Sequence, residues 1–258
     1  MKLWVASKAI FYRNLVLMRS YFFNTISMLV TMYIVFLLMF YGAKAVGGAS
    51  LSMGDTLEGL IVGYLVWMFA IMAYSDLSWS LTNEAQVGTL EQLYLSPAGF
   101  KWLSGMNLAS NFLLNAVIAF VLLLGIMLTT GHWLRLDLIS LLPLLVVTVL
   151  SAYGIGFAMG GLALIFKRIQ SFFQILQFVF VAFIVLPWDR FPWAKYLPLA
   201  MGNVLTRRVM VEGTRLWQLP FSDLLVLAGT SLFYLAAGLV AFSTCERAAK
   251  DRGLLGHY

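Results

Sequence analysis

The chain has 258 residues, of which 62% are hydrophobic and only 11% are charged, and its mean hydropathy is +0.90. Soluble domains are about half apolar and about a quarter charged, so this composition excludes an ordinary water-soluble enzyme and predicts a polytopic membrane protein. The formal net charge of +6 does not indicate nucleic-acid binding, because the basic residues mostly flank apolar runs, where lipid headgroups and topology account for them.

The first segment, residues 3–19, mixes apolar side chains such as Trp4 and Phe11 with basic ones such as Lys8 and Arg13. This mixture predicts a helix that lies in the membrane interface with its apolar side toward the hydrocarbon. An ordinary basic flank of the first span is the alternative interpretation.

Six apolar runs follow, each long enough to cross about 30 Å of hydrocarbon as a helix at about 1.5 Å per residue. We expect spans over residues 21–41, 59–81, 103–131, 138–166, 169–188 and 224–245. Ala43-Lys44-Ala45 resembles a signal-peptide cleavage site, but the first run is longer than the usual signal core of about 7–15 residues, so we interpret it as a span. The sequence thus predicts one all-α membrane domain over residues 1–258.

The segment between the last two spans, residues 189–223, contains prolines among aromatic residues. Prolines at this spacing prevent one continuous helix. We therefore expect an external re-entrant region of short helices, covered by protein or water where it enters the membrane.

Basic residues set the expected orientation. Lys2, Lys8, Arg13 and Arg19 precede the first span, whereas the loop after it holds only Lys44. Since the more basic side of the first span usually stays inside, we expect both termini in the cytoplasm.

Residue types that carry catalysis or bind metals are scarce. Cys245 is the single cysteine, and His132 and His257 are the two histidines, so a disulfide framework or a multi-histidine metal site in this chain is not expected. No Gly-Lys dipeptide occurs, so a phosphate-binding P-loop is also missing. Asp76 is the one ionisable residue inside a predicted span, and its place near the cytoplasmic end favours a solvated carboxylate over a proton relay.

Two stripes of amide side chains occur at helical spacing within the spans. They are Asn107, Asn111 and Asn115 in the third span, and Gln170, Gln174 and Gln177 in the fifth. Amides that faced lipid would lack hydrogen-bond partners, so we expect each stripe to meet another helix or a wet cavity. The pattern alone leaves open whether the stripes pack helices or line a substrate entrance.

The cytoplasmic loop between the second and third spans contains Glu84-Ala85-Gln86-Val87-Gly88-Thr89-Leu90-Glu91-Gln92-Leu93-Tyr94-Leu95-Ser96-Pro97. Residues 84–95 can form a short amphipathic helix that Pro97 ends, with Leu90, Leu93 and Tyr94 on one face. An exposed helix of this kind suits insertion into a groove on a soluble partner, although a helix lying idle at the interface fits the composition too.

This loop resembles the first cytoplasmic loop of the permease subunits of type-2 ABC transporters, which carries a Glu, then Gly-Thr-Leu-Glu, a few apolar residues and Ser-Pro. The matching residues are Glu84, Gly88, Thr89, Leu90, Glu91, Leu93, Leu95, Ser96 and Pro97. The interfacial N-terminal helix, the six spans and the proline-rich external region also resemble that family. The Asn-Pro usual in its external region is absent here, where Leu197-Pro198 and Gly202-Asn203 stand instead.

The resemblance implies an exporter in the cell (inner) membrane of a prokaryote. Two permeases, identical or paralogous, would pair among the membrane lipids, and each would dock one cytoplasmic P-loop ATPase through a coupling helix at residues 84–97. Glu84, Gly88 and Glu91 would transmit the motion, and Lys167 and Arg168 would make a lesser contact. ATP and Mg would bind the partner, so this chain itself would be no enzyme and hold no cofactor.

Under the same resemblance, the two amide stripes would face either the lateral substrate entrance or the seam between the two permeases. The expected substrate is a hydrophobic or amphipathic compound, with a glycan or glycolipid as the alternative. Two functions of other classes are alternatives: an ion-coupled secondary carrier, and an embedded enzyme, which the missing cluster of nucleophile, base and orienting group disfavours.

Overall fold

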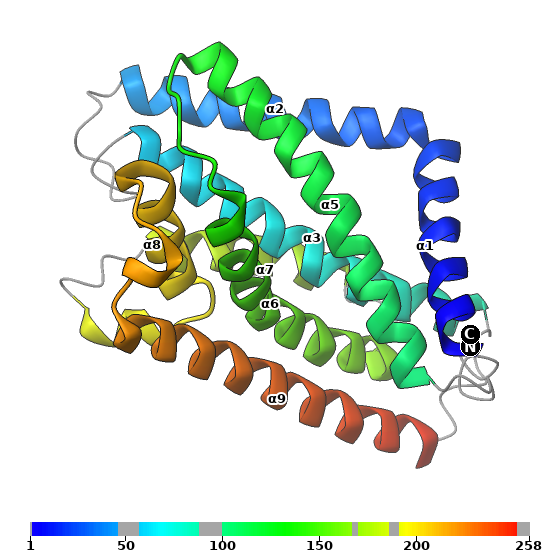
Figure 1. Cartoon of the computed structure of the whole chain (residues 1–258). Coiled ribbons are helices and arrows are strands. Elements are labelled where there is room, and N and C mark those ends of the chain that lie inside the picture. The colour runs from blue at the N-terminus through cyan, green and yellow to red at the C-terminus, as the bar shows by residue number, and fades with distance from the viewer. Residues whose placement is uncertain (1, 46–56, 88–99, 167–169, 186–190, 252–258) are drawn as a thin grey trace.

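The computed structural model describes residues 2–45, 57–87, 100–166, 170–185 and 191–251, and throughout these ranges the regular structure is helical (Figure 1). The longer helices are α1 (Lys2–Ser20), α2 (Phe22–Ala45), α3 (Leu57–Val87), α5 (Phe100–Thr130), α6 (Leu138–Phe166), α7 (Gln170–Val185) and α9 (Phe221–Asp251). The shorter elements are η1 (Pro192–Tyr196), α8 (Ala200–Arg207), η2 (Arg208–Glu212) and η3 (Leu216–Gln218).

Five helices, α2, α3, α5, α6 and α9, are long and apolar enough to cross a membrane. Large apolar side chains on their outer faces are exposed, among them Phe23 at 84%, Leu38 at 71% and Ile139 at 74%. Water-soluble monomers rarely expose so much contiguous apolar surface, so hydrocarbon is the environment that this surface fits. The chain therefore has the architecture of a multi-pass membrane protein.

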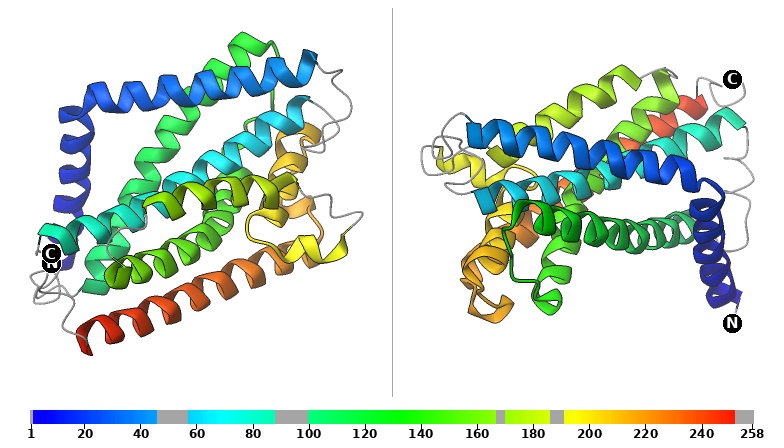
Figure 2. Two further views of the ribbon diagram at one scale, coloured as in Figure 1. Left: turned by 180° about the vertical axis from the view of Figure 1, so that it is seen from behind. Right: turned by 90° about the horizontal axis from the view of Figure 1, so that it is seen from above.

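The spanning helices lie lengthwise between two ends of the molecule (Figures 1 and 2). We call one the terminal end, where α1 and the last turns of α9 lie, and the other the far end, where α8 and the three η elements lie. The expected span 138–166 coincides with α6. The fifth expected span, 169–188, corresponds to α7, which covers 16 described residues and is shorter than the other five.

α3 forms the centre of the bundle. Buried residues make up 83% of its membrane-length segment, against 6% for α2. The run from Leu60 to Tyr74 is apolar on nearly every side, and a helix of that kind is stable only when other helices surround it. α2, α5, α6, α7, α8 and η2 all contact α3, so most of the described elements pack on this helix.

α3 also extends further than the sequence predicts. The second span was expected to end near Leu81 and a separate coupling helix to begin at Glu84, but α3 continues unbroken to Val87. Residues 84–87 are thus the last turn of α3, because polar residues that leave the hydrocarbon can keep their helical hydrogen bonds in water. The rest of the expected coupling helix, residues 88–97, lies outside the described residues.

α6 and α9 form the most extensive helix pair, and glycines allow their close approach. A Cβ atom at Gly238 of α9 would overlap the backbone carbonyl of Gly154 of α6, and one at Gly154 would overlap the backbone of Tyr234. One at Gly161 would lie 2.9 Å from the Cα atom of Phe242. Small residues at such crossings let helix backbones meet, which is the main source of helix association in lipid.

At the far end, the backbone turns repeatedly between α7 and α9. Pro192 begins η1, Pro198 stands just before α8, and Pro220 immediately precedes α9, so the prolines interrupt the helices as expected. Leu199 has a left-handed backbone conformation with φ of 68°, and α8 runs directly into the π-helical turn η2, which Gly213 ends at φ of 75°. The described residues between α7 and α9 thus contain short helical elements; that they form an external re-entrant region stays a prediction.

Candidate functional site

The residues expected to contact an ATPase belong to two segments of the sequence, and the helices before and after each segment meet the terminal end of the molecule. Glu84 belongs to the last turn of α3, and its side chain lies outside the described residues. Gly88, Thr89, Leu90, Glu91, Leu93 and Pro97 lie outside them, as do Lys167 and Arg168. The helices that border both segments, α3 and α5 for the first and α6 and α7 for the second, end or begin at the terminal end (Figures 1 and 2).

A buried amide cluster joins α1 to α5 at the same end. The Nδ2 atom of Asn14 lies 2.8 Å from Oδ1 of Asn107, 2.9 Å from Oδ1 of Asn111 and 3.1 Å from Oγ of Ser110. Asn14 is only 8% exposed, and its amide nitrogen has two hydrogens to donate to these three acceptors. The Asn14 amide thus gives these acceptors on α5 a hydrogen-bond donor on α1.

Two of the three expected asparagines of the third span thus have a partner in the first helix. Asn115, one turn further along α5, is half-buried. The sequence predicted that these amides need a partner but missed that Asn14 supplies it. An asparagine inside an otherwise apolar and basic helix was the available signal, since a polar side chain at that position needs a hydrogen-bond partner.

The glutamines of the fifth span occupy a different environment. Gln174 is exposed on α7, Gln177 is half-buried, and the side chain of Gln170 lies outside the described residues. α7 is held to α3 through its backbone carbonyls: Trp67 donates its indole N–H to the carbonyl of Gln177 at 3.1 Å, and the Tyr74 hydroxyl donates to the carbonyl of Phe173. These contacts leave the Gln174 amide facing outward from the bundle.

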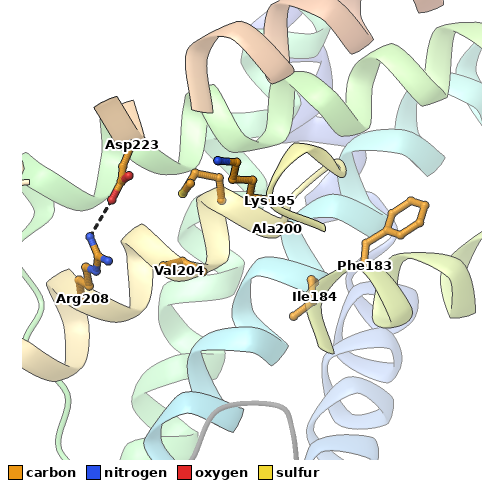
Figure 3. A pocket seen from close by; sticks show the side chains of 8 residues that line it. Phe183, Ile184, Lys195, Ala200, Val204, Arg208 and Asp223 are labelled. Carbon is orange, nitrogen blue, oxygen red and sulfur yellow. Dashed lines mark hydrogen bonds and ion pairs between the residues drawn. The ribbon is translucent and has the colours of Figure 1, made fainter. Parts of the chain in front are cut away.

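The far end contains a cavity of about 170 Å³ between α7, η1, α8 and α9 (Figure 3). Its lining consists of Phe183, Ile184, Lys195, Ala200, Met201, Val204, Arg208 and Asp223. Arg208 donates from Nη1 to Oδ2 of Asp223 at 2.8 Å, and this pair lies at one side of the cavity while Phe183 and Ile184 lie at the other. The sequence alone did not indicate a role for these charged residues, because in a single sequence the charges outside the spans indicate only how the spans are oriented.

A polar contact at the far end connects α3 to the segment after α5. The Nδ1 atom of His132 lies 2.6 Å from Oε1 of Glu58, and both side chains are 31% exposed. The Phe40 ring of α2 packs edge-on against the His132 ring with centroids 5.8 Å apart. This contact joins α2, α3 and the segment after α5 near the surface and is partly screened by solvent.

The described side chains offer little for metal or cofactor chemistry. Within the described ranges, no group of three or more His, Cys, Asp or Glu residues could hold a metal ion. Neither a protein-family model nor a curated protein sequence matches this chain.

Proposed function

We propose that this chain is the membrane permease of an ATP-driven exporter of the type-2 ABC class, working as a pair with a second copy or a paralogue. The observation that carries the proposal is the run Gly88-Thr89-Leu90-Glu91 with Ser96-Pro97, preceded by Glu84, between the second and third spanning helices. An exposed amphipathic helix with an apolar face between carboxylates suits a groove on a soluble ATPase.

Three features of the described helices support this proposal. α1 runs crosswise to α2 at the terminal end, as a helix lying in the membrane interface would (Figure 1). The apolar helix α7 is proposed as a sixth crossing, and the short η elements with α8, which precede α9, are proposed as the re-entrant region. Six crossings put both termini on one side of the membrane, which the positive charge before the first span assigns to the cytoplasm.

The continuity of α3 gives the proposed mechanism a physical route. Because α3 runs without a break from the buried core to Val87, a force applied to residues 84–97 by an ATPase acts directly on the most buried helix. Closure of two ATPases around ATP then rocks the two permeases and moves substrate outward. The energy source lies in the partner, which binds ATP and Mg.

The surface proposed to contact the second permease, and the proposed class of substrate, are inferred from where the amide and hydroxyl side chains of the spans lie. The exposed amide of Gln174 lies among exposed apolar residues of α7 such as Phe172 and Phe178, so a second permease that covers this face would satisfy it. The described spans carry amides and hydroxyls in an apolar background. The proposed substrate is accordingly a hydrophobic or amphipathic compound.

Co-purification and transport test the proposal together. The tagged chain, solubilised in detergent, should retain a protein that contains a P-loop and hydrolyses ATP. Glu91→Arg should remove that protein and stop ATP-dependent export, whereas Glu212→Arg, which reverses an exposed carboxylate at the far end, should change neither. Transport that continues in Glu91→Arg and follows an ion gradient would replace the proposal with an ion-coupled carrier.

A further inference from the structure

The charges that line the far-end cavity do not balance. Lys195 and Arg208 contribute two cations, and Asp223 contributes one carboxylate, which pairs with Arg208. Within the described residues, Lys195 has no carboxylate at ion-pair distance; its ammonium lies 5.0 Å from the centroid of the Tyr196 ring. Among the described side chains that line the cavity, the cations thus exceed the carboxylates by one, which favours an anionic occupant.

The start of α8 adds to this positive potential. Ala200 and Met201, the first two residues of the helix, line the cavity, and the N-cap residue Leu199 has a side chain without any hydrogen-bonding group. The N–H of Ala200 donates to the carbonyl of Leu197 at 3.4 Å, so this helix end contributes mainly the partial positive charge that favours anions. Leu199 reaches this position through a left-handed backbone that a branched residue adopts only at an energetic cost.

The remaining lining is apolar and suits carbon chains. Its apolar side chains are those of Phe183, Ile184, Met201 and Val204, and the first two lie on the side away from the Arg208–Asp223 pair (Figure 3). The volume of about 170 Å³ is similar to that of an engineered cavity of about 150 Å³ that holds benzene. It accommodates a phosphate group together with the glycerol carbons attached to it.

The surrounding aromatic residues place the cavity at the depth of lipid headgroups. Trp193 and Tyr196 of η1 and Trp217 of η3 are exposed at the same end of the molecule, and Arg215 lies 5.3 Å from the centroid of the Trp217 ring. Tryptophan and tyrosine concentrate at the boundary between hydrocarbon and water, where lipid phosphates lie. Acyl chains extending from a phosphate in this cavity would thus reach hydrocarbon directly.

We propose that the far-end cavity binds the phosphate group of an anionic membrane lipid through Lys195 and Arg208, with its glycerol carbons against Phe183, Ile184 and Val204. Asp223 fixes the Arg208 guanidinium and limits the affinity, because its negative charge opposes the phosphate. This site is independent of the transport proposal, since it requires only that the chain spans a membrane.

Titration of the purified full chain in non-ionic detergent with dihexanoyl phosphatidylglycerol, followed by thermophoresis, tests the proposal. Lys195→Gln should weaken binding about tenfold, because one charge-assisted hydrogen bond is lost. Asp223→Asn should tighten binding severalfold, a change that a merely structural role of this pair would not produce. Arg215→Gln, which removes a cation at the same membrane end outside the cavity, should leave binding unchanged.

Two further probes separate the parts of the ligand. Dihexanoylglycerol, which has the same acyl chains without phosphate, should not compete, and inorganic phosphate should bind far more weakly than the lipid. Equal binding of inorganic phosphate and lipid would overturn the assignment to an amphiphile. Unchanged binding in Lys195→Gln, weaker binding in Asp223→Asn, or an equal loss in Arg215→Gln would overturn the site.

Discussion

Replacing Gly238 of α9 by alanine tests the packing that joins α6 to α9. The added methyl group would overlap the backbone carbonyl of Gly154, and a backbone atom cannot move aside as the end of a flexible side chain can. The two helices must therefore separate locally and lose contacts along their interface. Gly229, in the same helix, has open space where a Cβ atom would be placed, so Gly229→Ala is the matched control.

The comparison between the two variants isolates the steric cost. Alanine favours a helix over glycine by about 0.8–1.0 kcal/mol, and this gain is common to both positions. The difference between the variants is then the cost of overpacking, about 1–3 kcal/mol. For a chain of this size, about 1 kcal/mol shifts the melting temperature by about 2–4 °C, so Gly238→Ala should melt roughly 2–12 °C below Gly229→Ala.

Far-ultraviolet circular dichroism of the two purified variants in the same detergent measures this difference. We expect Gly229→Ala to melt at or slightly above the unsubstituted protein and Gly238→Ala to melt clearly below Gly229→Ala. Equal melting temperatures for the two variants would refute the close backbone contact between Gly154 and Gly238.

Three further substitutions test individual contacts. Asn14→Ala removes the donor shared by Asn107 and Asn111, so it should lower the free energy of unfolding by about 0.5–2 kcal/mol and speed amide hydrogen exchange in α1. Arg13→Ala, at the exposed neighbouring position, should produce neither effect. Unchanged exchange in Asn14→Ala would contradict the cluster. Tyr64→Phe removes the hydrogen bond of 2.6 Å from the Tyr64 hydroxyl to the carbonyl of Met32. Since little else of α2 is buried, amide hydrogen exchange in α2 should become about fivefold faster. Tyr41→Phe, at an exposed position of the same helix, should lack this effect. Glu58→Gln weakens the partly exposed pair with His132 and should cost less than about 1 kcal/mol in a denaturant titration; a larger loss would show that the pair is not screened by solvent.

Much of the helical architecture could be predicted, because charge and hydropathy mark where a chain enters and leaves hydrocarbon. The prediction for α6 matches to the residue, since Asp137 and Lys167 directly flank the apolar run. The end of α3 could not be found in this way. Hydropathy locates the membrane boundary near Leu81, whereas the helical hydrogen bonds continue through polar residues to Val87.

The candidate sites depend on tertiary contacts that a single sequence does not specify. The amides of Asn107 and Asn111 predicted a polar partner, but the identity of Asn14 depends on how α1 turns back onto α5. The pairing of Arg208 with Asp223 likewise depends on the left-handed Leu199 and the π-helical turn after α8, and backbone irregularities of this kind have no periodic signature in the sequence.

The central claim, that residues 84–97 receive force from an ATPase, is tested most directly by photo-crosslinking in intact cells. A photoreactive amino acid replaces Leu90, and in a control it replaces the exposed Trp217 at the far end. We predict a light-dependent adduct at position 90, and mass spectrometry of the crosslinked partner should identify peptides of a protein that contains a P-loop. Adding Glu91→Arg should abolish this adduct. An adduct without a P-loop protein at position 90, or the same ATPase captured equally from position 217, would contradict the account.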